Sequence, residues 1–452
     1  FFATATYSWK GRYVINGTTR YEGSNRLGKS RSARWLPTWN LSGAWNAHEE
    51  SWFEKLKPVL SNFTAKLSYS LTADRGPSSI TNSRAVIKAD NPWRPSASDK
   101  ESSLYIAWLA NQDLTYEKKH ELNFGIDAGF LNNRINFTFD IYTRRNYDLI
   151  GATNTMGIGG ETTKYGNVAK MKSNGVELSL NTVNIKTKDF TWSTDFIYSH
   201  MHNEVTELNT YNRLYDYISG YGFTMPGYPQ RSLFSIPFAG LNNEGLPTFY
   251  DPDGNITVTG IDMQEYDPER LKFLKYEGPA DPTDVGSFGN IFRYKNLTLN
   301  LFITYSFGNV VRLDPVFSSR YSDLSATPKE FNNRWIKPGD EKYTNIPVIA
   351  SKQQLNNIAD LDRAYQSYNY STARVAKGDF IRMKEISLAY EFPKTITQAL
   401  NIANLSLKLQ ATNLFLLYAD KKLNGQDPEF FNAGGVATPM PKQFTLTLKF
   451  GI

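Results

Sequence analysis

The end of the chain carries the pattern that decides the fold: residues 444–452 read Phe-Thr-Leu-Thr-Leu-Lys-Phe-Gly-Ile. An apolar residue stands at every second position, and Thr, Lys or Gly stands between. Because successive side chains of a β-strand point to opposite faces, this alternation predicts a strand with one apolar and one polar face. The same alternation recurs in residues 63–71, 122–130, 297–307 and 405–412. The chain is therefore predicted to be all-β.

These strands are long for a soluble protein. Each spans about ten residues, the length that a tilted strand needs to cross a bilayer, whereas strands of soluble sheets are nearer five or six. Aromatic residues gather toward strand ends, as at Tyr7, Trp9, Trp39, Trp45 and Trp192. Such positions suit the aromatic girdles at the membrane interfaces, although aromatics also have a high β-propensity of their own. The pattern favours an antiparallel transmembrane β-barrel over a soluble β-protein.

Composition excludes several classes of protein. The 452 residues include no Cys, so neither a disulfide framework nor a Cys-ligated metal site is possible. No apolar run approaches the roughly 18 residues of a membrane-spanning helix, which excludes a helical membrane protein. Aromatic residues make up 14% of the chain, which argues against disorder. The net charge of +6 is spread along the sequence, so no nucleic-acid partner is expected.

Connections between the expected strands alternate between short and long. The short ones are residues 10–12, 131–133, 186–189 and 295–296, with longer members at 49–62 and 393–404. The long ones are residues 25–34, 73–117, 151–166, about 208–283, 308–377 and 420–441. Short turns on the periplasmic side and long loops outside are typical of an outer-membrane barrel.

The strand count predicts a larger barrel than this chain can close. We expect about 13 strands, at residues 2–9, 13–22, 36–46, 62–72, 119–130, 134–146, 174–185, 190–203, 285–294, 297–307, 379–392, 404–414 and 442–452. Bacterial barrels have an even number of strands with both termini in the periplasm. The odd count therefore predicts that residues 1–452 are the C-terminal portion of a single barrel domain whose first strands are missing.

Several segments resemble a known family. They are Gly166–Leu180, Arg334-Trp-Ile-Lys-Pro-Gly-Asp340, Gly378–Pro393, Ala411-Thr-Asn-Leu-Phe415, Asp427-Pro-Glu429 and the terminal strand. Near the start, residues 20–28 are similar to the pattern Arg-x-Asp-Gly-Ser-Ser-x-Phe-Gly, from which Glu22, Asn25 and Leu27 depart. In this order and spacing, the chain resembles the C-terminal barrel region of SusC/RagA-type TonB-dependent transporters of Bacteroidetes.

The resemblance implies a function and a set of partners. Such transporters are 22-stranded outer-membrane barrels closed by an N-terminal plug. A SusD/RagB-like surface lipoprotein caps the outer loops, and TonB with ExbB–ExbD pulls on the plug. The cargo is oligosaccharide or oligopeptide, no covalent reaction is catalysed, and no cofactor is needed. The barrel would contact lipid and lipopolysaccharide, and pairs of transporter and lid would form a homodimer.

Two other functions remain open at this point. A siderophore or cobalamin TonB-dependent receptor would share the barrel wall but lack the lipoprotein lid. A barrel adhesin would bind a partner through the long loops. An outer-membrane enzyme is disfavoured, because the sequence pattern shows no nucleophile with a nearby His and acid.

Loop aromatics are the candidate substrate-binding residues. Aromatic faces supply a large contact area at little cost in rotamer entropy, and could hold sugar rings or peptide side chains. The same residues could instead pack within folded loops or contact a lid protein. The candidates are Trp93, Tyr105, Trp108, Tyr211, Tyr215 and Tyr221.

The last outer loop carries a second candidate group. Asp427 and Glu429 could contact the lid or the substrate, or their carboxylates could anchor the loop by accepting backbone N–H groups. Asn413 ends the preceding strand and could fix the same corner. We favour the anchoring role.

Metal binding is only weakly indicated. Asp251, Asp253 and Asn255 have the start of a calcium-loop spacing, but Asp-Pro-Asp-Gly is also a common turn. His200 and His202 share one face of a strand without an evident third ligand. We therefore expect no metal and favour a plain turn over a structural calcium.

Overall fold

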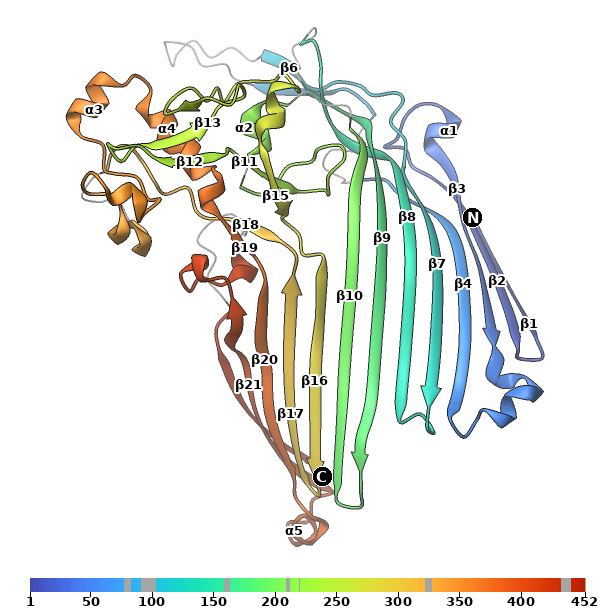
Figure 1. Ribbon diagram of the computed structural model, residues 1–452. Coiled ribbons are helices and arrows are strands. Elements are labelled where there is room, and N and C mark those ends of the chain that lie inside the picture. The colour runs from blue at the N-terminus through green and yellow to red at the C-terminus, as the bar shows by residue number, and fades with distance from the viewer. Residues whose placement is uncertain are drawn as a thin grey trace. The chain divides into compact units, whose positions relative to one another are not determined.

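A computed structural model describes residues 1–76, 83–90, 103–157, 163–208, 212–218, 220–321, 327–431 and 440–451. Thirteen strands form one sheet, in the order β1-β2-β3-β4-β7-β8-β9-β10-β16-β17-β20-β21-β22 (Figure 1). Their bounds are β1 Phe2–Trp9, β2 Tyr13–Gly23, β3 Trp35–Asn46, β4 Leu60–Asp74, β7 Glu117–Phe130, β8 Ile135–Asn154, β9 Thr163–Lys186, β10 Phe190–Leu208, β16 Asp284–Tyr294, β17 Leu297–Phe307, β20 Phe380–Glu391, β21 Asn404–Ala419 and β22 Gln443–Gly451.

The predicted 13 strands are therefore confirmed, and each lies beside its neighbour in the sequence. The largest difference is β9, which begins about eleven residues before the predicted start at residue 174. Lys170 pairs with Glu207 of β10 at 2.6 Å, and Lys172 pairs with Glu204 at 2.9 Å. Cross-strand ion pairs thus extend this hairpin beyond the alternating apolar segment from which the strand was predicted.

The outer connections, which were predicted to be loops, contain short strands and helices. Their short strands, within the described residues, are β5 Val86–Asp90, β6 Ser103–Trp108, β11 Ser232–Ser235, β12 Phe238–Leu241, β13 Pro247–Tyr250, β14 Ile256–Thr257, β15 Lys275–Pro279, β18 Val310–Arg312 and β19 Val375–Lys377. The α-helices are α1 Arg31–Arg34, α2 Leu214–Tyr217, α3 Lys352–Asn357, α4 Leu361–Asn369 and α5 Lys394–Ala399. None of the helices in these ranges has both the length and the hydropathy needed to cross a membrane.

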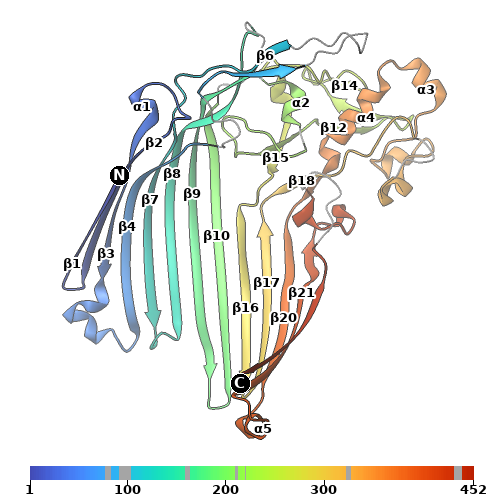
Figure 2. The same ribbon diagram turned by 180° about the vertical axis from the view of Figure 1, so that it is seen from behind.

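The chain divides into two compact units. The first holds β1–β8, most of β9 and the outer end of β10, and the second holds the rest of β9 and β10 and nearly all that follows. In each unit the tight turns lie at one end of the strands and the long connections at the other (Figures 1 and 2). In the first unit, Leu27, Leu114 and Tyr116, which belong to two of the outer connections, form a small buried cluster.

The second unit contains an outer domain, which we define as α2 with residues 229–283, 308–321 and 327–378. Its core includes Ile236, Leu246 and Phe249 with Tyr365 and Tyr368, all at most 2% exposed. Tyr368 of α4 makes edge-to-face contacts with Phe317 at 5.3 Å and Phe238 at 5.6 Å. Two connections far apart in sequence thus share one hydrophobic core.

Candidate functional site

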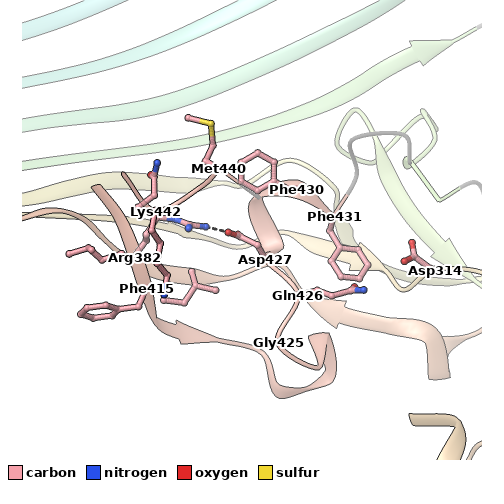
Figure 3. Close-up of a pocket in the computed structure, with 13 residues that line it drawn as sticks. Asp314, Arg382, Phe415, Gly425, Gln426, Asp427, Phe430, Phe431, Met440 and Lys442 are labelled. Atoms are coloured by element: carbon pink, nitrogen blue, oxygen red, sulfur yellow. Dashed lines mark hydrogen bonds and ion pairs between the residues drawn. The ribbon is translucent and has the colours of Figure 1, made fainter. Parts of the chain in front are cut away.

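A cavity of about 540 Å³ opens beside the outer ends of β20 and β21 (Figure 3). The segment after β21 contributes two short 3₁₀ helices, η7 Lys421–Leu423 and η8 Pro428–Phe430. The lining residues are Asp314, Arg382, Asn413, Leu414, Phe415, Leu416, Gly425, Gln426, Asp427, Phe430, Phe431, Met440 and Lys442. The cavity therefore combines aromatic walls with one buried cation and several polar groups.

Arg382 is the central charged group of this cavity. One guanidinium nitrogen donates to Asp427 Oδ1 at 2.5 Å and lies 3.3 Å from Glu429 Oε2. The side chains of Arg382 and Asp427 are 5% and 10% exposed, whereas Glu429 is 42% exposed. Because the pair is nearly dry, its attraction is screened far less than that of a surface ion pair. Arg382 thereby ties the last outer loop to β20.

The register of the sheet explains where Arg382 points. It lies opposite Thr304, while the neighbouring Met383 lies opposite Ile303 of the apolar face. Arg382 therefore stands on the polar face of β20. Sequence reasoning missed this residue, although it lies within the Gly378–Pro393 segment that carried the family resemblance.

Asn413 marks a β-bulge in β21. Met383 pairs with Phe415 and Glu385 with Thr412, so one residue of β20 faces two of β21 at this point. Asn413 has φ of 53°, a left-handed conformation that Asn tolerates better than other residues with a side chain. Its side chain is buried, and its Oδ1 has no hydrogen-bond partner within the described residues. The bulge re-aims the outer end of β21 around the cavity.

Asp427 and two further carboxylates fasten the outer rim of this unit. Asp427 caps η8 by accepting the Glu429 N–H at 3.1 Å, with Pro428 at the first helical position. Asp379 accepts the Gly308 N–H at 2.7 Å. Asp420 accepts the N–H groups of Lys377 and Lys422 at 2.9 and 3.0 Å. These contacts support the anchoring role for Asp427, with Glu429 as the more exposed partner of Arg382.

A second buried arginine lies in the outer domain. The guanidinium of Arg312 donates to Ser235 Oγ and the Ser371 carbonyl, both at 3.0 Å, and to the Phe234 carbonyl at 2.5 Å. Burial lowers the pKa of Arg312 to about 10, and the charge of Glu277 opposes part of this change. Arg312 thus joins β11, β18 and the segment that follows α4, and its role is architectural.

The predicted loop aromatics fall into different parts of the molecule. Tyr105 and Trp108 lie on β6 in the first unit, where Lys88 Nζ lies 5.6 Å from the Trp108 ring centroid. Tyr215 and Tyr221 belong to the second unit and are 40% and 53% exposed. Tyr215 meets Tyr370 edge-to-face at 6.0 Å. Trp93 and Tyr211 lie outside the described residues.

The candidate calcium loop has the geometry of a turn. Asp251 Oδ1 accepts the N–H groups of Asp253 and Asn255 at 2.9 and 2.8 Å, as the side chain at the start of an Asx turn does. His200 Nδ1 lies 2.9 Å from Asp284 Oδ1. Across the described ranges, no three His, Asp or Glu side chains are grouped so as to hold a metal ion.

Comparison with known proteins gives a family match. The family model "TonB dependent receptor-like, beta-barrel" matches residues 1–414. The TonB-dependent receptor SusC of Bacteroides thetaiotaomicron is 27% identical over 466 residues, covering 99% of this chain and 43% of that protein. The TonB-dependent receptor P3 of Formosa agariphila is 25% identical over 451 residues, covering 95% of this chain and 41% of that protein.

The solved RagAB peptide transporter has a similar fold. It superposes with a TM-score of 0.77 at 24% identity, and the match covers 99% of this chain and 47% of that chain. This chain therefore spans less than half the length of the relatives it matches.

Proposed function

The chain belongs to the TonB-dependent receptor-like β-barrel family, and we propose that it forms the wall of a transporter that imports large nutrients across the bacterial outer membrane. The proposed cargo is oligosaccharide or oligopeptide, and the proposed partner is a SusD/RagB-like lipoprotein lid. TonB with ExbB–ExbD would drive uptake through a plug that closes the complete barrel. The family is one of transporters and receptors, and its members reside in the outer membrane.

The polar face of the sheet supports a transport role. In the first unit, Arg144 pairs with Glu121 at 2.8 Å, and Lys66 pairs with Asp127. In the second, Lys408 pairs with Glu385 at 3.6 Å. All of these residues alternate with the apolar positions that face lipid. A face lined by charges suits a hydrated passage that a large polar solute can cross.

The exposed apolar surface of the outer domain is the observation that carries the proposal of an external partner protein. It is folded around its own core, yet it exposes large apolar and aromatic side chains: Tyr343 is 89% exposed, Tyr266 is 71% exposed and Ile336 is 66% exposed. Tyrosine is enriched where proteins contact one another. We propose that the lid docks on this surface.

The test is affinity purification of the complete protein, as its organism encodes it, followed by measurement of lid co-purification and labelled-cargo uptake. Tyr343→Ser is expected to reduce lid recovery several-fold, because an interface aromatic is lost. Tyr390→Ser is the matched control, since Tyr390 is 39% exposed at the hairpin-turn end of β20. Deletion of TonB should abolish uptake of oligosaccharide or oligopeptide.

Three results would contradict the proposal. Uptake of a ferric siderophore or cobalamin without a lid would favour the small-chelate receptor. Tight binding to a host protein without uptake would favour the adhesin. Equal lid recovery from Tyr343→Ser and wild type would remove the outer domain as the docking surface.

A further inference from the structure

The outer end of the apolar face carries an unexpected group of polar side chains in the first unit. His120 of β7 lies opposite Arg145 of β8, and Leu122 lies opposite Thr143. On the other side, His120 lies opposite Leu71 of β4, and Leu122 lies opposite Tyr69. Directly paired residues share a face of the sheet, so His120 and Arg145 stand on the same face as Tyr69 and Leu122.

This face is the one that meets lipid. Leu67, Leu122 and Ile141 on it are 54%, 43% and 46% exposed, which is a poor arrangement for water and a suitable one for acyl chains. His120 stands ten residues from Phe130, the last residue of β7 at the hairpin-turn end. Ten residues of a strand tilted by about 45° rise roughly 24 Å, close to the height of the apolar band of a membrane barrel. His120 and Arg145 therefore lie at the level of the outer-leaflet headgroups.

Stacked aromatic rings brace this position. The His120 ring stacks between Tyr69 at 5.6 Å and Tyr147 at 5.7 Å, and Trp39 meets Tyr69 edge-to-face at 5.3 Å. The two tyrosine hydroxyls lie 3.2 and 3.4 Å from the imidazole nitrogens. Figure 1 shows β4, β7 and β8, which carry these rings apart from Trp39, side by side. The rings form a rigid outer girdle with a polar centre.

Charge compensation is uneven within this group. Lys118 is paired with Asp148 at 2.6 Å. Arg145 is exposed, and it makes no hydrogen bond or ion pair within the described residues. Arg144, the next residue, points to the polar face and pairs with Glu121 at 2.8 Å. Lipid-facing cations are costly unless they reach an anion at the interface. The structure therefore leaves one guanidinium on the lipid side without an anion.

We propose that Arg145, with His120 beside it, binds the phosphate of a lipid headgroup in the outer leaflet. A guanidinium offers phosphate two parallel N–H donors. Both imidazole nitrogens of His120 lie beside tyrosine hydroxyls, so His120 contributes a polar surface next to Arg145 rather than a further donor. The aromatic girdle lies at the depth of the headgroups, and the acyl chains lie over Leu67, Leu122 and Ile141. This inference does not rest on import or on a lid, since it concerns the lipid-facing surface alone.

The test uses the complete protein in phosphatidylcholine nanodiscs that contain lipid A or dephosphorylated lipid A. Retained lipid is counted by native mass spectrometry after mild extraction. Wild type should retain lipid A and not its dephosphorylated form. Arg145→Gln should retain about tenfold less, the loss expected for one charge-assisted bidentate contact. Arg145→Lys keeps the charge but loses the two parallel N–H donors, so it should retain an intermediate amount of lipid A.

Arg144→Gln is the matched control, because it removes the same charge one residue away on the opposite face. It should retain lipid A as wild type does. Equal retention by Arg145→Gln and wild type would overturn the proposal, as would equal loss in both variants. Displacement of lipid A by millimolar inorganic phosphate would show that the source is a free anion and would also overturn it. Transport activity enters none of these readouts.

Discussion

The sheet and the outer domain of the second unit are stabilised in different ways. On the lipid face of the sheet, Leu409 and Leu446 are 54% and 65% exposed, and the strands are held by their backbone ladder. In the outer domain, Ile236 and Phe249 are fully buried in a core that needs no bilayer. The sheet therefore depends on lipid as its solvent, whereas the outer domain folds as a water-soluble protein does.

The largest expected effect separates these two regions. Tyr368→Ala removes a ring that is 2% exposed and packs against Phe317 and Phe238. Truncating a fully buried aromatic costs about 3–5 kcal/mol. Hydrogen exchange should show lost protection in residues 229–283, 308–321 and 327–378, with β17 and β20 still protected.

Tyr343→Ala is the control for that experiment. Tyr343 is 89% exposed, so its truncation should change protection by less than about 0.5 kcal/mol. If Tyr368→Ala also released the amides of the sheet, the two regions would be one cooperative unit and the comparison would fail.

A second, smaller effect concerns the contact that joins sheet to loop. Arg382→Met removes the cation that faces Asp427 and leaves that carboxylate buried and unpaired. Breaking a buried ion pair from one side costs about 3–5 kcal/mol, and the Glu429 N–H that Asp427 still accepts should reduce the loss to about 2–3 kcal/mol. We expect faster proteolytic cleavage in residues 420–431. The electrophoretic mobility of the unheated, folded barrel should stay unchanged.

The double variant Arg382→Met with Asp427→Asn sharpens this reading. It removes both charges with little change in volume and keeps a side-chain oxygen that can accept the Glu429 N–H, so it should recover much of the protection. No recovery in the double variant would mean that Arg382 acts through another contact, and the anchoring role of Asp427 would be withdrawn.

The same comparison shows how far the sequence predicts the structure. Alternation along β17 and β22 predicted strand ends to within one residue, because each strand meets lipid on one face for its whole length. The outer domain escaped prediction, since its short strands and helices are fixed by contacts such as Phe238 with Tyr368, far apart in sequence. Local patterning carries no signal for such pairings.

The candidate site was also predicted only in part, because only some of its contacts join residues that are close in sequence. The Asp-Pro-Glu motif indicated a carboxylate anchor, because its chemistry is local. Its partner Arg382 lies 45 residues away, and only the register of β20 against β17 shows that it points to the polar face. Likewise, Asn413 was expected at a corner, but the bulge that requires its left-handed backbone follows from pairing between strands.

The smallest expected effect tests whether pH acts on one region alone. Glu265, in a turn of the outer domain, accepts the N–H groups of Asp267 and Tyr266, both at 3.0 Å, and lies 2.9 Å from Arg270. The backbone N–H of Asp267 is the largest cause that holds the pKa of this carboxyl below its ordinary value of 4.5.

A depressed pKa makes the folded turn more stable above the unfolded pKa, and that stability is lost as pH falls through the folded value. Lowering the pH below about 4 should therefore lower the hydrogen-exchange protection factors, which are corrected for the pH dependence of intrinsic exchange, in residues 262–270, while those in the interior of β17 stay unchanged. Glu265→Gln should remove this dependence, because an amide does not titrate. If the variant kept the same acid response as wild type, another carboxylate of the outer domain would control it, and the N–H groups of Asp267 and Tyr266 would have no measurable part in holding the turn.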